Sequence, residues 1–121
     1  MREPFRDIDR LQHIKERIGY IMDFLRGKTF EDMKSDLMCY HAVVYNIMII
    51  GEAANLLTKE FRDSHPEDPR RDIVDMRNVL VHGYFTTSAV FIWETYKKDL
   101  PPLLMHVESY IEELRSNNIY G

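Results

Sequence analysis

Apolar residues recur every three or four positions through most of this 121-residue chain, and this spacing constrains its fold more than any other feature. An amphipathic helix places residues at such intervals on one face. Half-buried strands would instead alternate apolar and polar residues, and no segment does so. The sequence therefore predicts an all-α fold. The first expected helix ends near Gly27 and carries the apolar residues Ile8, Leu11, Ile14, Ile18, Ile21, Met22 and Leu25.

A second helix is expected in the middle of the chain, from about Phe30 to about Lys59. Thr29 is followed three residues later by the acid Asp32, a spacing typical of a helix-starting capping box. The second half of this helix is apolar on most sides. We therefore expect it to be covered by neighbouring helices on one side and by a second subunit on the other. Two prolines and several charges predict a loop from Phe61 to Arg71.

The last third of the chain predicts two further helical segments. Asp72 to Val81 reads as a short helix stopped by Gly83, and Ser88 as the N-cap of a final helix. Pro101-Pro102 are expected to kink or break that helix. Four or five helices joined by short connections predict an up-and-down bundle, formed by residues 1–121 as a single domain.

Composition limits where such a protein works and what it binds. The single cysteine, Cys39, excludes an internal disulfide and favours a reducing, cytoplasmic setting. The most apolar run, Ala42 to Gly51, is too short to span a bilayer, so no membrane association is expected. No metal or cofactor is expected either, because the histidines His13, His41, His65 and His106 lack metal-ligand spacing.

The charge balance argues against broad contact with nucleic acid. The formal net charge is −4, from 16 basic and 20 acidic residues. A protein that coats nucleic acid presents a wide basic surface. This composition still allows a local site that handles one phosphate with one or two arginines.

Arg77, Asn78, His82 and Tyr84 lie together beside a predicted helix end and form the candidate site. Metal-independent RNA cleavage needs a base for the 2′-hydroxyl proton, a cation for the phosphate and an acid for the leaving oxygen. Histidine suits acid or base work near neutral pH, and arginine donates a planar fork of hydrogen bonds to phosphate. Asn78 could orient either group.

The spacing of Arg77 and His82 limits how they can cooperate. Residues five apart lie about 140° from each other on a regular helix. His82 directly precedes Gly83, so a frayed helix end could re-aim it. One histidine cannot be both acid and base at once, and a two-fold axis would bring two Arg-His sets into one cleft. We therefore expect a homodimer with a composite site.

Glu52 is the only carboxylate in the apolar stretch of the second helix. A buried carboxylate normally needs a partner, so we expect Glu52 to pair with Arg77 and orient it. A helix-surface glutamate is an equally consistent interpretation. In the same way, an arginine and a histidine near a helix end are commonly capping or surface residues.

Three blocks of sequence resemble the HepT-like toxins, a branch of the HEPN superfamily. Arg77-Asn78-x-x-x-His82-x-Tyr84 is similar to the Arg-x4-His-x-Tyr motif of that family. Ile50 to Ala54 resembles the family's second-helix segment. Ile92 to Thr95, followed by Lys98 to Pro101, resembles its last helix.

The resemblance implies a HEPN-like helical homodimer that acts as a metal-independent ribonuclease toxin. It also implies an antitoxin partner, a minimal nucleotidyltransferase that adenylylates the motif tyrosine, here Tyr84. An AMP group two residues from His82 would block the cleft and place negative charge where the RNA phosphate must lie. Two alternatives remain open: a non-catalytic dimer that binds a nucleotide or a partner protein, and a purely structural helical dimer.

Overall fold

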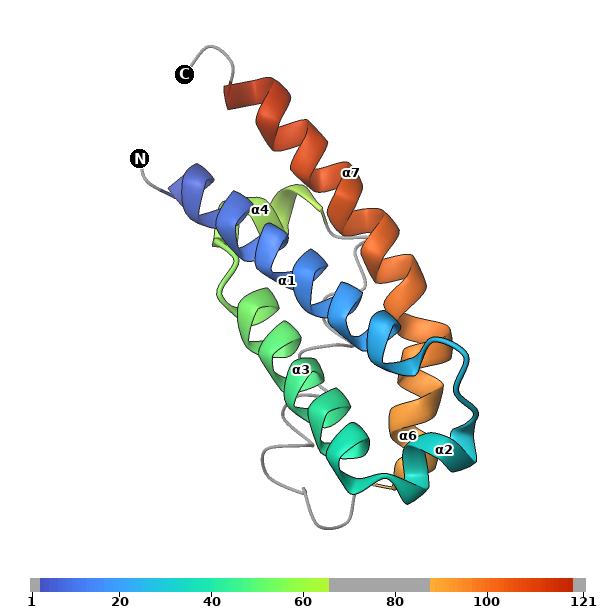
Figure 1. Cartoon of the computed structure of the whole chain (residues 1–121). Coiled ribbons are helices and arrows are strands. Elements are labelled where there is room, and N and C mark those ends of the chain that lie inside the picture. Colours follow the sequence, from blue (N-terminus) through green and yellow to red (C-terminus); the bar gives the residue numbers. More distant parts are fainter. Residues whose placement is uncertain (1–2, 66–87, 119–121) are drawn as a thin grey trace.

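The computed structural model describes residues 3–65 and 88–118 of the chain, and every element within these ranges is helical. This confirms the all-α bundle predicted from the apolar spacing. In chain order, the elements are α1 (Glu3–Leu25), α2 (Phe30–Ser35), α3 (Leu37–Asn55), α4 (Lys59–Ser64), α6 (Ala89–Glu94), the π-helix η2 (Thr95–Asp99) and α7 (Leu100–Asn118) (Figure 1).

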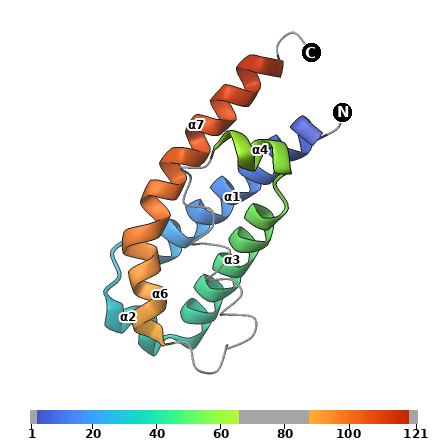
Figure 2. The same ribbon diagram turned by 180° about the vertical axis from the view of Figure 1, so that it is seen from behind.

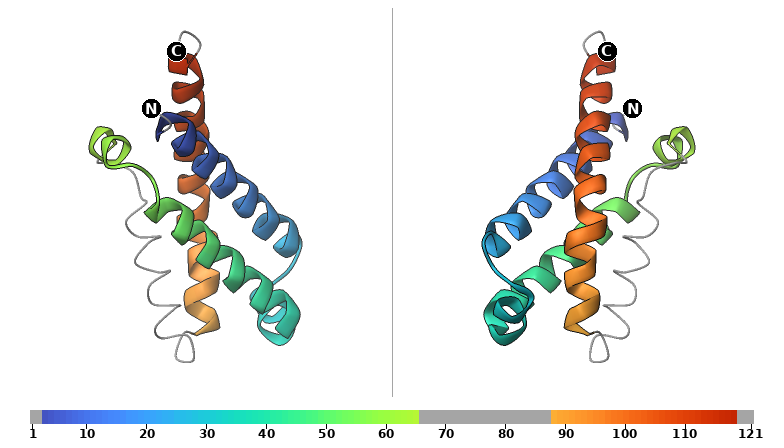
Figure 3. Two further views of the ribbon diagram at one scale, coloured as in Figure 1. Left: turned by 90° about the vertical axis from the view of Figure 1, so that its left-hand side faces the viewer. Right: turned by 90° about the vertical axis from the view of Figure 1, so that its right-hand side faces the viewer.

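Helix α1 packs against α3 on one flank and against α7 on the other (Figures 1 and 3). Ile14, Ile18 and Ile21 of α1 are at most 1% exposed, which confirms that its apolar spacing marks a buried face. Helices α2 and α6 lie together at one end of the bundle, and α4 lies at the other (Figure 2). The core they enclose also includes Ile47 and Ile50 of α3 and Leu103, Val107 and Ile111 of α7.

The single helix expected from Phe30 to Lys59 is wrong, because the chain interrupts it twice. Asp36 has an extended backbone, and its carboxylate accepts a hydrogen bond from the backbone N–H of Cys39 at 3.2 Å. It therefore ends α2 and caps α3. Short polar side chains that bond a nearby N–H favour helix ends over helix interiors. The expected capping box is confirmed, since Thr29 and Asp32 exchange both hydrogen bonds, at 2.9 and 3.1 Å.

The second interruption lies between α3 and α4, and it makes the loop expected from Phe61 wrong as far as Ser64. Thr58 caps α4, and Phe61 reaches the core with 5% of its surface exposed. Buried Asp7 of α1 accepts hydrogen bonds from the backbone N–H of Thr58 at 2.9 Å and from its hydroxyl at 2.7 Å. A helix this short carries too few apolar residues to show a period. The remainder of the expected loop and the helix expected over Asp72–Val81 lie outside the described residues.

Pro101-Pro102 neither break nor end the last helix. The chain passes from α6 through η2 into α7 as one continuous helical run (Figures 1 and 3). In η2 the backbone N–H of Leu100 donates to the carbonyl of Thr95, five residues earlier. Proline lacks an N–H and crowds the carbonyl four residues before it. The π turn lies immediately before both prolines, and the helical run continues through them without a break.

Helix α3 is the one described helix that is long and apolar enough to cross a membrane by length and composition alone. Helix α3 has 19 residues and is therefore longer than the apolar run from Ala42 to Gly51, which by itself is too short to span a bilayer. Packing within the bundle explains much of this apolar character, because Val43, Ile47 and Ile50 are fully buried. Its outer side keeps Met38 and Tyr45 largely exposed, at 85% and 56%. That a second subunit covers this side stays a prediction.

Substitution by alanine should change the stability of the fold in opposite directions at Gly27, which follows α1, and at Gly19, inside it. Gly27 follows α1 with a φ of +76°, a left-handed conformation in which a Cβ is strained, so Gly27→Ala should destabilise the fold by about 1 kcal/mol. Gly19 lies inside α1, and a Cβ built on it meets no described atom within 4 Å beyond the helix itself. Gly19→Ala should therefore stabilise by about 0.5–1 kcal/mol. Urea unfolding of both variants measures the difference, and equal effects would contradict these backbone assignments.

Candidate functional site

The core of the candidate site lies outside the described residues. Arg77, Asn78, His82 and Tyr84 all belong to residues 66–87, so their expected arrangement stays a prediction. Glu52 is the one candidate that is described. It lies in the last turn of α3 and is partly buried. Its expected partner, Arg77, lies outside the described residues, so their pairing stays a prediction.

The described elements fix both ends of the segment that carries the motif. On one side, α4 leads to His65, which is 7% exposed. On the other side, Ser88 caps α6 by accepting a hydrogen bond from the backbone N–H of Phe91 at 3.2 Å. Ile92, one turn into α6, is fully buried. The motif segment therefore starts and ends on residues that are tied to the bundle.

His65 joins α4 to α7 through one hydrogen bond and one ring contact, and it makes a second hydrogen bond and a second ring contact within its own segment, to Phe61 of α4. Its Nδ1 lies 2.8 Å from the carbonyl oxygen of Phe61, and its Nε2 lies 3.1 Å from Oε1 of Glu113 on α7. The ring lies 4.2 Å from that of Phe61 and 4.5 Å from that of Tyr110, between centroids. In the sequence, His65 is one of four histidines without metal-ligand spacing, and nothing in that spacing predicts its contact with α7.

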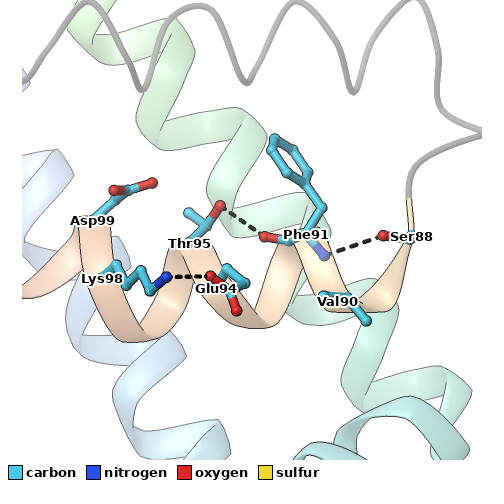
Figure 4. A pocket seen from close by; sticks show the side chains of 7 residues that line it. All are labelled: Ser88, Val90, Phe91, Glu94, Thr95, Lys98 and Asp99. Carbon is cyan, nitrogen blue, oxygen red and sulfur yellow. Dashed lines mark hydrogen bonds and ion pairs between the residues drawn. The ribbon is translucent and has the colours of Figure 1, made fainter.

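A shallow hollow of about 450 Å³ begins at Ser88 and follows α6 and η2 (Figure 4). Phe91, Thr95 and Asp99 lie one turn apart along the same side of this helical run. Figure 4 shows Lys98 reaching back to Glu94, with its Nζ 2.7 Å from the carboxylate. The remaining lining residue is Val90. π turns of this kind occur often at functional sites. In the sequence, the feature that could have pointed to this turn is the proline pair Pro101-Pro102 that follows it.

The charges of this hollow do not suit a phosphate. Its one amine, Lys98, is paired with Glu94, whose hydrogen bond and charge raise the pKa of that amine. The carboxylate of Asp99 adds a second negative charge beside it. An anionic substrate would meet two carboxylates and one already paired amine. Among the described lining residues, the one amine is already paired, and the expected phosphate cation, Arg77, lies outside the described residues.

Other reactive groups among the described residues offer no competing site. No cluster of three or more histidine, cysteine or acidic side chains in residues 3–65 and 88–118 could hold a metal ion. Burial raises the pKa of the Cys39 thiol, and the nearby carboxylate of Asp36 raises it further. Cys39 is thus poorly suited to act as a nucleophile, because the thiolate is the reactive form.

Comparisons with known proteins connect this helical frame to one family. The sequence model described as "Ribonuclease HepT-like" matches residues 14–110, a range that includes the whole Arg77–Tyr84 motif. No solved structure gives a significant match to the chain.

Named relatives resemble the chain over most of their own length. The "Probable ribonuclease HepT" of Thermococcus cleftensis is 39% identical over 95 residues, which cover 78% of this chain and 86% of the relative. A protein of Caldanaerobacter subterraneus subsp. tengcongensis named as a "Putative RNase" is 36% identical over 103 residues, which cover 85% of this chain and 92% of the relative. The match of the family model and these relatives agree: the chain belongs to the HepT-like ribonuclease family.

Proposed function

We propose that this chain is a metal-independent endoribonuclease and the toxin of a toxin–antitoxin pair, acting in the cytoplasm. Arg77 and His82 are its catalytic residues, with Asn78 and Glu52 in supporting roles. The observation that carries the proposal is the family match over residues 14–110, because it contains the one segment whose side chains suit RNA cleavage. The names of the relatives, both ribonucleases, support the same activity.

The proposed reaction is an internal transfer at one phosphodiester. The imidazole of one His82 takes the proton of the 2′-hydroxyl, and the 2′-oxygen forms a bond to the adjacent phosphorus. The bond from phosphorus to the 5′-oxygen breaks, and a second, protonated His82 gives that oxygen a proton. Arg77 holds the negative charge that gathers on the phosphate in the transition state. The products are a 2′,3′-cyclic phosphate and a 5′-hydroxyl, and no metal takes part.

A homodimer supplies the two histidines that this reaction needs. A two-fold axis puts the same residues of both subunits into one cleft. Helix α3 supports such an association, because its exposed side includes the large apolar side chains of Met38 and Tyr45, and its C-cap residue Leu56 is exposed as well. Exposed apolar groups of this size favour a subunit contact. They complement the buried half of α3, which the chain covers with its own helices.

Control of this activity is proposed to act on Tyr84. A minimal nucleotidyltransferase antitoxin would transfer AMP from ATP, with the phenol oxygen of Tyr84 attacking the α-phosphorus and pyrophosphate leaving. The added phosphate is negative and bulky, and it would stand two residues from His82. It would therefore repel the RNA phosphate and fill the space that the substrate needs.

Purified protein should cut single-stranded RNA at the same rate with and without EDTA and leave 2′,3′-cyclic phosphate ends. Arg77→Ala and His82→Ala should each slow cutting by at least about 100-fold, because each removes a group that acts in the transition state. Gel analysis of end-labelled RNA measures both. His106→Ala is the matched control, since this histidine of α7 bonds Tyr110 within its own helix and should not affect the rate.

A fully 2′-deoxy strand of the same sequence should stay intact, because it lacks the attacking hydroxyl. Cutting of that strand, or undiminished cutting by the Arg77→Ala/His82→Ala double variant, would contradict the mechanism. Tight binding of ATP or of the nucleotidyltransferase without any RNA cleavage would favour the non-catalytic dimer, which the net charge of −4 also allows.

Co-expression with a nucleotidyltransferase encoded beside it should increase the intact mass of the protein by one or more AMP units. Tyr84→Phe should abolish the gain, because it removes the accepting oxygen and little else. Tyr45→Phe serves as the control, since Tyr45 is an exposed tyrosine of α3 outside the motif. If the gain in mass persisted in Tyr84→Phe and disappeared in Tyr45→Phe, AMP would be attached to Tyr45, and the proposal would be contradicted.

A further inference from the structure

One flank of α1 carries a row of cationic and aromatic side chains that the core does not use. Its members recur at three- and four-residue intervals, so they share one side of the helix. We call this row the α1 stripe, and it consists of Arg10, His13, Arg17, Tyr20 and Phe24. Contact between Arg17 and Asn46 places the stripe on the flank of α1 that faces α3. The opposite flank faces α7, where Lys15 pairs with Glu108 at 3.7 Å.

Arg17 is held in place by three neighbouring side chains, none of which is a carboxylate. Its Nε donates to Nε2 of His13 at 3.2 Å, and its Nη1 donates to Oδ1 of Asn46 at 3.1 Å. The guanidinium carbon lies 5.5 Å from the ring centre of Tyr20. Asn46 is 4% exposed and is fixed by its own bond to the carbonyl of Ala42, at 2.8 Å. The guanidinium is therefore oriented, while its positive charge has no carboxylate among the described residues to balance it.

Arg10, two turns earlier, also has no carboxylate partner among residues 3–65 and 88–118. Its Nε is buried, and no hydrogen-bond acceptor reaches it in the described part of the chain. A buried donor of a charged group normally has an acceptor, and leaving it without one is costly. In a chain with a net charge of −4, two such arginines on one flank of one helix form a local positive site. An anionic oxygen is the group that suits the oriented guanidinium of Arg17 and the partly exposed side chain of Arg10.

Tyr20 and Phe24 continue the stripe with two flat apolar faces. Their ring centres lie 6.4 Å apart with an angle of 19° between the planes, and the residues are 40% and 37% exposed. Two nearly parallel, accessible rings beside a row of cations match the pattern of single-strand binding surfaces. There, bases stack on aromatic rings while basic groups follow the backbone.

The charge of the stripe argues for a nucleic acid strand over a second copy of the chain. A two-fold interface sets a patch against itself, and this patch would bring arginines toward arginines. Asp9 and Glu16 lie on the neighbouring, solvent-facing ridge of α1. They would repel a phosphate backbone there and confine a strand to the flank that borders α3.

We propose that the α1 stripe binds a single-stranded segment of the RNA substrate, with phosphates against Arg10 and Arg17 and bases against Tyr20 and Phe24. This inference rests on the proposed function for the identity of its ligand. It adds a binding surface in α1 that is separate from the cleaving motif, which lies far along the chain. A dimer would carry two such surfaces.

The test measures binding of a fluorescent single-stranded oligouridine by full-length protein in the His82→Ala background, where no cleavage interferes. Tyr20→Ala should weaken binding about tenfold, and Tyr20→Phe should retain it, because the flat ring remains. Arg17→Gln should lower the slope of log Kd against log salt concentration by about 0.7, the change expected for one lost phosphate contact on a single strand. Lys15→Gln removes a charge from the opposite flank of the same helix and should leave both the affinity and the slope unchanged.

Three results would overturn the proposal. Unchanged affinity in Tyr20→Ala and Arg17→Gln would show that RNA does not use the stripe. An equal loss of affinity in Lys15→Gln would show that the weaker binding reflects net charge alone and not the α1 stripe. Conversion of Tyr20→Ala to a monomer in sedimentation would make the stripe a subunit interface. The proposed function fails independently, since it requires cleavage by the unaltered protein, whereas the stripe requires only binding by a chain that cannot cleave.

Discussion

Burial of one face of α1 between α3 and α7 is the constraint on which the other features of this structure depend. Ile14, Ile18 and Ile21 leave that face no room for chemistry, so the polar groups of α1 are confined to its flanks and outer ridge. The same packing sets the start of α4, because Asp7 of α1 holds Thr58 through two hydrogen bonds. Loss of this core would therefore destabilise α1, α3, α4 and α7 together.

This helical bundle suits the proposed enzyme, whose catalytic residues are expected in one short segment. Cleavage demands that the reacting groups be positioned before the substrate arrives, since positioning supplies much of the rate enhancement. The segment between His65 and Ser88 starts at a histidine clamped to α7 and ends at a helix cap. Membership of the HepT-like ribonuclease family points to RNA cleavage as the activity, which the fold alone could not name, and the proposal places that activity in this segment.

The sequence predicted the parts of the fold that rest on period and on capping chemistry. The buried face of α1, the capping box at Thr29 and the cap at Ser88 follow from residues close in the chain. It missed the break at Asp36, the helix around Phe61 and the π turn before the prolines, because each depends on contacts or backbone geometry that no period records. Of the candidate site, the sequence named Glu52 and the motif by type and spacing. The clamp of His65 on Glu113, 48 residues away, left no local signal.

The proposed mechanism depends on one RNA-cleaving cleft that takes groups from both subunits, and mixed dimers can show whether such a cleft exists. Unaltered chains can be exchanged with Arg77→Ala/His82→Ala chains in varying proportion, and RNA cleavage measured at constant total protein. A composite site predicts that activity falls as the square of the unaltered fraction, because only dimers with two intact subunits contain both an acid and a base. Activity that falls in simple proportion to that fraction would mean that each subunit cleaves alone, and it would contradict the account.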